Sequence, residues 1–129
     1  MFDEMKFAAL LQKVSTLNPK LATADEVINM ATYNGANALG IDAGSIEVDK
    51  KADLILVDTN APNMTPMSNA ISSNLVYSAN GSNVDTTICN GKVLMEGRKL
   101  LTVDEGHILS EAKRAIAEMK ELREAEAEE

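Results

Sequence analysis

Few residues of this chain have side chains suited to nucleophilic, acid–base or metal chemistry. The sequence holds one histidine, His107, and one cysteine, Cys89. They do not supply the three or four ligands of a zinc site, and a serine or cysteine triad would need His107 as its base. His107 lies at the start of a predicted helix, which favours an exposed histidine of no structural consequence over a contact or titrating role. Cys89 lies in a predicted strand beside a turn, which favours a small buried hydrophobe over a reactive thiol.

The carboxylates and glycines also give weak signals. Asp53 and Asp58 flank a short apolar run. One interpretation is a carboxylate pair for acid–base catalysis. The favoured interpretation is that both residues end the strand at solvent or accept hydrogen bonds from backbone N–H groups. Asn80–Asn83 and Asn34–Ala36 contain isolated glycines, without a dinucleotide or Walker phosphate motif. The stretch Met64–Met67 is typical of loop packing. The residues alone therefore predict no catalytic, cofactor-binding or metal-ligating residue in this chain.

Length, charge and composition bound the class of protein. The chain has 129 residues, the length of one domain, and a net charge of -8, which argues against nucleic-acid binding and against an anionic membrane surface. A single cysteine precludes an intrachain disulfide. No apolar run approaches the roughly 20 residues of a membrane span, and the N-terminus lacks the pattern of a secretory signal. We therefore expect a cytoplasmic protein with neither nucleic-acid nor membrane partners.

The N-terminal residues predict helices. Helical spacing of apolar residues predicts a helix over 2–14, ended by Asn18-Pro19. The sequence Thr23-Ala24-Asp25-Glu26 is a capping box that starts a second helix through about Tyr33. Asn34-Gly35 is expected to interrupt that helix, and a further helical turn over 36–39 is expected to stop at Gly40.

The pattern then changes to that of strands and loops. Residues 44–48 alternate in polarity and precede a turn at 49–51, and the run 54–57 predicts a strand buried on both faces. Residues 59–73 predict a long loop, and 74–78 a short helix or strand.

The C-terminal third predicts a hairpin followed by a helix. Residues 84–101 read as a β-hairpin around Asn90-Gly91, because both central positions of a type I′ turn need positive φ. A second capping box, Thr102 to Glu105, predicts a helix to about Leu122. That helix carries an apolar seam and is expected to pack on the sheet, while residues 124–129 are expected to fray. The seam consists of Ile108, Ala112, Ala115, Met119 and Leu122.

The order of these segments resembles the C-terminal end of the amidohydrolase superfamily, in the branch of methylthioadenosine/S-adenosylhomocysteine deaminases and chlorohydrolases. The resemblance covers residues 1–122 and rests on four stretches; Asp49 stands where a glycine is common, and aspartate tolerates the left-handed backbone of that turn. The stretches are MFDEMKFAALLQKV, ATYNGANALGI, GSIEVDKKADLILVD and NLVYSANGSNVDTTICNGKVLMEGRKLLTVDE.

The resemblance implies a (β/α)₈ barrel that holds one divalent metal, zinc or iron, and a small β-sandwich built from both chain ends. The family's ligands are an HxH pair, two further histidines and an aspartate, with a glutamate assisting proton transfer to a metal-activated water. None of those positions has a counterpart in this chain, and the ligand aspartate is expected shortly before Met1. The resemblance therefore implies no cofactor held by this chain.

The expected fold is α+β, with N-terminal helices, a small, mostly antiparallel sheet and a C-terminal amphipathic helix. Residues 1–44 resemble the end of the barrel, 45–101 the composite sandwich, and 102–129 form the helix and an acidic tail. Residues 2–39 are expected to exchange amide protons faster than residues 54–101.

Three functions remain open. The chain is a C-terminal, non-catalytic fragment of a metal-dependent deaminase of adenosine-type nucleosides; an autonomous α+β binding module that self-associates through an exposed sheet edge; or half of a split enzyme that completes a separate barrel.

Overall fold

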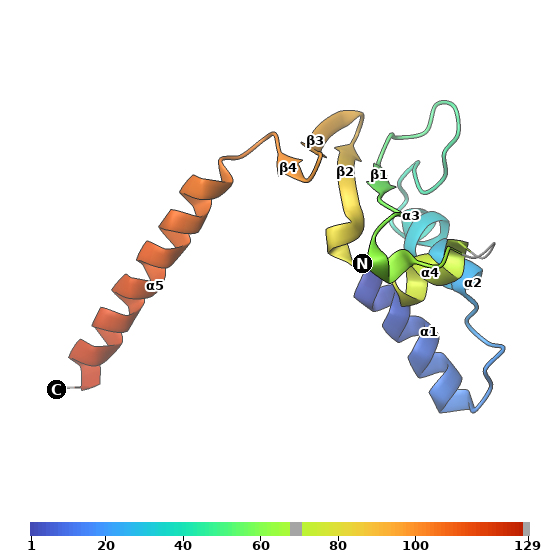
Figure 1. Ribbon diagram of the computed structural model, residues 1–129, viewed down its shortest axis with the longest axis horizontal. Coiled ribbons are helices and arrows are strands. Elements are labelled where there is room, and N and C mark those ends of the chain that lie inside the picture. Colours follow the sequence, from blue (N-terminus) through green and yellow to red (C-terminus); the bar gives the residue numbers. More distant parts are fainter. Residues whose placement is uncertain (68–70, 128–129) are drawn as a thin grey trace.

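The computed structural model describes residues 1–67 and 71–127 and confirms the α+β class (Figure 1). Helices and a four-stranded antiparallel sheet follow one another along the chain. The helical elements are α1 (Phe2–Thr16), α2 (Ala24–Asn29), η1 (Met30–Asn34), α3 (Gly35–Ala38), η2 (Pro62–Met64), α4 (Ile71–Tyr77), η3 (Gly81–Asn83) and α5 (Glu105–Ala127). The strands are β1 (Leu54–Val57), β2 (Val84–Cys89), β3 (Lys92–Glu96) and β4 (Lys99–Leu100).

The first helix forms as predicted and runs two residues further, to Thr16. It ends at Leu17, which adopts a left-handed conformation with φ of 53° and closes the last turn. The Lys13 ammonium donates hydrogen bonds to the carbonyl oxygens of Leu21 and Ala22, at 2.7 and 2.5 Å. These bonds hold the loop that leads to α2 against the end of α1.

The predicted capping box at the start of α2 is confirmed. The Glu26 N–H donates to Thr23 Oγ1 at 3.3 Å, and the Thr23 N–H donates to Glu26 Oε2 at 2.7 Å. The predicted interruption at Asn34-Gly35 is wrong, because both residues keep right-handed helical angles and the helix passes through the wider turn η1 into α3. A Cβ on residue 35 would stand 3.2 Å from the Met30 carbonyl oxygen, so glycine suits this turn by its size. The left-handed glycine is Gly40, which ends α3 as predicted.

Residues 44–48 do not form the strand that their alternation suggested. Ile46 and Val48 are 87% and 90% exposed, and the sheet begins only at Leu54. An alternating segment becomes a strand only where a neighbouring strand completes its hydrogen bonds. The turn that follows is formed as expected, since Asp49 adopts a φ of 69°.

The sheet is a meander in the order β1-β2-β3-β4, with each strand antiparallel to the next. The predicted turn at Asn90-Gly91 is confirmed, since both residues have positive φ, 49° and 78°. Extra residues at Asp85 in β2 and Leu94 in β3 shift the register between neighbouring strands. The sheet is therefore short and irregular.

The strand β1 has the predicted bounds, but the prediction that both of its faces are buried is wrong. Ile55 and Leu56 point to opposite faces and are 50% and 57% exposed. The apolar run is typical of a strand whose two faces are both packed against other elements. In this chain, neither face of β1 is fully covered.

The core lies in the helical part of the molecule, where α1, α2 and α4 pack together. The segment predicted as a loop over 59–73 already contains η2 and the start of α4, and residues 74–77 are helical rather than extended. Residues 68–70 of that predicted loop lie outside the described residues. The buried cluster consists of Met5, Ala9, Ala24, Val27 and Val76.

The C-terminal helix does not pack on the sheet as predicted; α5 projects away from the rest of the chain (Figure 1). Its first turn is capped by Asp104, whose Oδ1 accepts the His107 N–H at 3.0 Å, so the predicted capping box at Thr102 is wrong. The helix continues to Ala127, beyond the predicted end at Leu122.

Candidate functional site

The residues best suited to chemistry lie on the surface. His107 is exposed in the first turn of α5, as predicted, and it enters the cap through its backbone N–H. Cys89 is also exposed, so its predicted burial is wrong. Cys89 is the last residue of β2 before the hairpin turn, on a sheet with open faces, and no other element covers it in the described structure.

Asp53 and Asp58 stand at opposite ends of β1 and bind backbone groups, as the favoured interpretation predicted. Asp53 Oδ1 accepts the Asn90 N–H at 2.6 Å, which ties the hairpin turn to β1. Asp58 Oδ1 accepts the Asn60 N–H at 2.9 Å, and its Oδ2 accepts from Arg98 Nη2 at 2.8 Å. The Asn60 N–H and, next, the Arg98 guanidinium hold the pKa of Asp58 below its ordinary value. Both carboxylates thus serve as structural hydrogen-bond acceptors.

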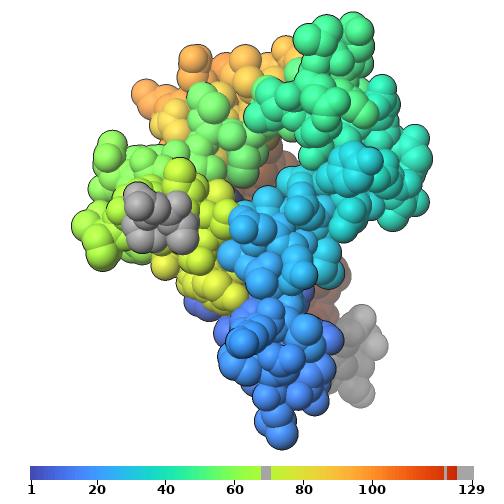
Figure 2. All heavy atoms as spheres, turned by 90° about the vertical axis from the view of Figure 1, so that its right-hand side faces the viewer, coloured from blue at the N-terminus to red at the C-terminus, as the bar shows by residue number. Residues whose placement is uncertain are grey.

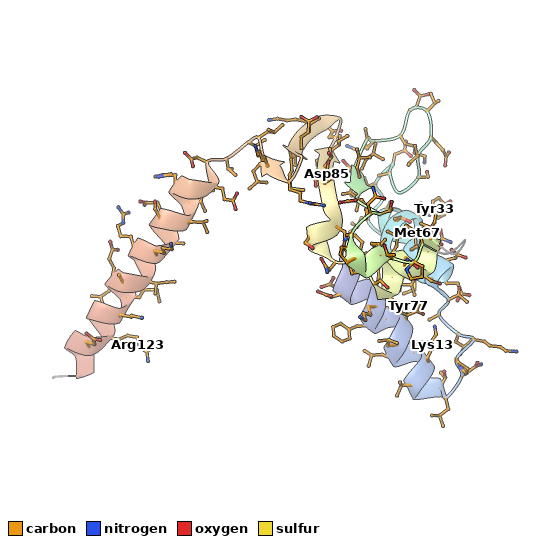
Figure 3. The ribbon with its side chains drawn as sticks, in the orientation of Figure 1. Lys13, Tyr33, Met67, Tyr77, Asp85 and Arg123 are labelled. Carbon is orange, nitrogen blue, oxygen red and sulfur yellow. The ribbon has the colours of Figure 1, made fainter. Side chains whose placement is uncertain are left out.

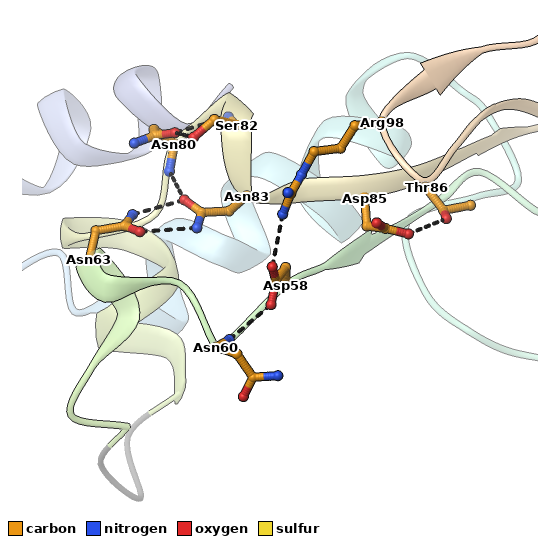
Figure 4. A network of polar contacts seen from close by, with 9 residues as sticks. All are labelled: Asp58, Asn60, Asn63, Asn80, Ser82, Asn83, Asp85, Thr86 and Arg98. Atoms are coloured by element: carbon orange, nitrogen blue, oxygen red, sulfur yellow. Dashed lines mark hydrogen bonds and ion pairs between the residues drawn. The ribbon is translucent and has the colours of Figure 1, made fainter.

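An asparagine pair joins the segment before α4 to the start of β2 (Figure 4). Asn83 is 1% exposed and exchanges two amide hydrogen bonds with Asn63, at 2.8 and 3.1 Å. Asn83 Oδ1 also accepts the Asn80 N–H at 3.0 Å, while Asn80 Oδ1 accepts the Ser82 N–H at 2.9 Å. A buried amide satisfied in this way fixes one conformation. The sequence pattern predicted only loop residues at these asparagines, and the repeated asparagines in both segments were the available signal of the pair.

The described residues offer no cluster of ligands for the metal that the resemblance implies. Within residues 1–67 and 71–127, no three His, Cys, Asp or Glu side chains converge on a point where an ion could bind. Met64 is fully buried, consistent with the predicted packing role, whereas Met67 is 40% exposed. No catalytic step is therefore assigned to a residue described here.

An open apolar depression runs between α1 and the start of η1. It has a volume of about 490 Å³, and its lining contains no histidine, cysteine or carboxylate. Figure 2 shows a neighbouring face, where α2, α4 and the loop after α3 meet. The depression is lined by Ala8, Leu11, Gln12, Val14, Ser15, Ala22 and Met30.

Exposed apolar side chains continue from this depression along α1. Phe7, Leu11 and Val14 are 62%, 64% and 69% exposed. Together with the open faces of the sheet, they form an exposed apolar surface, and contiguous surfaces of this kind are typical of contact sites. The candidate functional site of this chain is therefore this exposed apolar surface. Over the described part of the chain, no helix combines the length and apolarity needed to cross a membrane.

Comparison with known proteins identifies the fold family. A family model described as the amidohydrolase family matches residues 1–94, which is most of the chain. The chain belongs to the amidohydrolase family. The resemblance drawn from the four sequence stretches is thereby confirmed, and the short sheet and the helices before it are parts of an amidohydrolase fold.

Relatives within the amidohydrolase family match nearly the whole chain. The 5'-deoxyadenosine deaminase of Methanobrevibacter smithii is 58% identical over 123 residues, which are 94% of this chain and 28% of that protein. The 5-methylthioadenosine/S-adenosylhomocysteine deaminase of Thermococcus onnurineus is 54% identical over 119 residues, 92% of this chain and 28% of that protein. The chain spans about 28% of the length of these curated relatives.

A solved structure confirms the arrangement of the elements. The adenosine deaminase from Xanthomonas campestris, crystallised with bound zinc, superposes with a TM-score of 0.86 at 32% identity. The match covers 93% of this chain and 28% of that one. The geometry of this amidohydrolase segment therefore occurs within a longer chain.

Proposed function

We propose that this chain is the C-terminal part of a metal-dependent amidohydrolase that deaminates adenosine-type nucleosides by hydrolysis. One observation carries the proposal: relatives that match 92% to 94% of the chain at 54% to 58% identity are deaminases of such nucleosides. The chain contributes the closing segment of that enzyme and is not catalytic alone.

Within this proposal, the three parts of the chain have separate roles. Residues 1–44 are the last helices of the barrel, residues 45–101 are one contribution to a composite β-sandwich, and residues 102–129 are the terminal helix and tail. The open faces of β1 support this assignment, because a strand that is apolar on both sides suits a covered sheet. The divalent metal, zinc or iron, would be held by ligands outside this chain.

The partner of the chain is accordingly the metal-bearing portion of the amidohydrolase fold. The net charge of -8 supports the absence of nucleic-acid and anionic membrane partners, and the single cysteine is compatible with a cytoplasmic location. An autonomous module that self-associates through a sheet edge is less favoured, since near-complete matches to a family of much longer proteins would be unexpected for it.

A chimera tests the proposal. This chain replaces the matching segment of the Methanobrevibacter smithii deaminase, and ammonia release from 5'-deoxyadenosine is measured with zinc present. We expect activity within about tenfold of the unmodified enzyme, since the substituted segment carries no catalytic group. The 129-residue chain alone should release no ammonia. A folded, zinc-loaded chimera without activity would contradict the proposal, as would activity of the chain alone.

A further inference from the structure

The helix α5 carries an apolar stripe that nothing in the described chain covers. Its large members, Ile108, Ile116 and Leu122, are 50%, 57% and 65% exposed. The side chains of α5 extend into open space on all sides (Figure 3). Among its described side chains, the ion pairs are internal and join Arg114 to Glu111 and Glu118. The full stripe comprises Ile108, Leu109, Ala112, Ala115, Ile116, Met119 and Leu122.

The width of this stripe indicates what kind of surface it meets. At 100° per residue, its members span about 140° of the helix circumference, which is typical of a helix facing a globular core and wider than a coiled-coil seam. Ala112 and Ala115 occupy two consecutive positions of the 4-3-4-3 spacing that runs from Ile108 to Leu122, where a two-stranded coiled coil would need large side chains. The stripe therefore suits a broad surface better than a second copy of α5.

The charges of α5 favour a protein surface over a lipid one. Residues 105–127 contain six glutamates against four lysines and arginines, whereas helices that lie on anionic membranes are rich in basic residues. Glu111 and Glu118 pair with Arg114 at 2.7 and 3.5 Å, so the charges of these two glutamates are balanced within the helix.

The solved relative places α5 in a longer chain. The Xanthomonas campestris match leaves too few residues of this chain uncovered to exclude the 23-residue α5, so part of α5 is superposed. A TM-score of 0.86 is compatible with the projecting position of α5 being a feature of that fold. In that protein, the greater part of the chain lies outside the match and is available to fill the space beside the helix.

From these observations we propose that the apolar stripe of α5 docks on the metal-bearing portion of the amidohydrolase, fastening the terminal helix to a part of the fold that this chain does not contain. This docking rests on the proposed function. It adds a second contact between this chain and the metal-bearing portion, separate from the exposed face of α1. Docking removes the stripe from water and makes α5 part of the enzyme's cooperative fold.

Hydrogen exchange tests this docking. The amides of residues 108–122 are compared between the 129-residue chain alone and the full-length chimera with the Methanobrevibacter smithii deaminase. We expect exchange about a hundredfold slower in the chimera, because burial of the stripe couples the helix to a larger structure. Equal exchange in the two proteins would overturn the docking.

A matched pair of variants gives a second readout. Ile116→Glu places a charge on the stripe, and Ala117→Glu places the same charge on the opposite side of α5. In the chimera, Ile116→Glu should lower the melting temperature or prevent folding while Ala117→Glu has little effect. In the chain alone, neither should matter. Equal effects of the two variants on the melting temperature of the chimera would overturn the docking. It would also be overturned if the chain alone sedimented as a dimer and Ile116→Glu abolished that dimer.

The two proposals fail in different ways. Slow exchange of α5 in a chimera that releases no ammonia would support the docking and contradict the proposed function. Ammonia release with α5 exchanging as freely as in the chain alone would overturn the docking and leave the proposed function standing. A chimera with neither property would contradict both.

Discussion

The helical part of this chain closes a core, whereas the sheet and α5 remain open. Ala9, Val27 and Val76, from three different helices, are all between 0% and 1% exposed. Among the described strand residues, only Thr86 is buried. Both regions carry apolar side chains, but only those of the helices pack into a buried cluster within the described chain. Apolar patterning thus indicates which face of an element is suited to burial. Whether that face is buried depends on the presence of a second surface that packs against it.

The sheet is held instead by directional contacts. Antiparallel ladders, the Asp53 bond to the hairpin turn and the Asp58–Arg98 pair fix its strands. Such contacts specify geometry but contribute modest net free energy where the side chains are exposed. We infer that the helical region determines the stability of the chain alone, and that the sheet gains its stability from contacts with the rest of the amidohydrolase fold.

The largest effect should come from a charge placed in the helical core. Val27→Asp buries a carboxylate without a partner and should cost more than about 3 kcal/mol, enough to unfold the chain. The same change in the sheet, Ile55→Asp, meets solvent and should cost about 1 kcal/mol or less. Urea unfolding followed by circular dichroism measures both. Equal destabilisation would remove the contrast between the two regions.

Amide exchange in the chain alone should follow the same contrast. The buried cluster predicts exchange about tenfold or more slower in α1 and α2 than in β3 and β4. This reverses the order expected from the sequence, because the helices find partners in α4 while the sheet remains uncovered. Residue-resolved exchange of the unmodified chain measures it, and faster exchange in the helices would restore the original expectation.

The buried asparagine pair should give the next largest effect. Asn83→Ala leaves the Asn63 amide and the Asn80 N–H without their partner and should cost about 2 kcal/mol. Asn60→Ala is the matched control, since Asn60 is exposed and contributes its backbone N–H to Asp58. Thermal unfolding measures both variants, and similar melting temperatures for the two would show that the pair does not hold the junction.

The smallest effect should come from acid titration of Asp58. Because its pKa is lower in the folded chain, ionised Asp58 stabilises the fold above about pH 4, and this contribution is lost as pH falls through the folded pKa. Asp58→Asn should therefore differ from the unmodified chain at neutral pH, and the difference should shrink in acid. Arg98→Gln should remove less of this dependence, since the Asn60 N–H is the larger cause. Melting temperatures between neutral and acid pH measure this, and a difference that grows in acid would contradict it.

Much of the local structure was determined by the sequence alone. The Thr23–Glu26 capping box, the Asn90-Gly91 turn and the bounds of β1 all formed as predicted. Each depends on backbone conformation and hydrogen bonds among residues close in sequence, or on a run of apolar residues within one element. The sequence stretches also identified the family, and the residue types indicated structural aspartates in place of an acid–base pair.

Burial and docking were decided only by the tertiary structure. The exposure of Cys89 and Leu56, the projecting α5 and the Asn63–Asn83 pair depend on which surfaces meet across long separations in sequence. The same apolar pattern becomes a core in α2 and an open stripe in α5, because burial requires a partner surface that the pattern itself does not contain. For this chain, the helices supply such a partner to one another, while the sheet and α5 present surfaces suited to a larger fold.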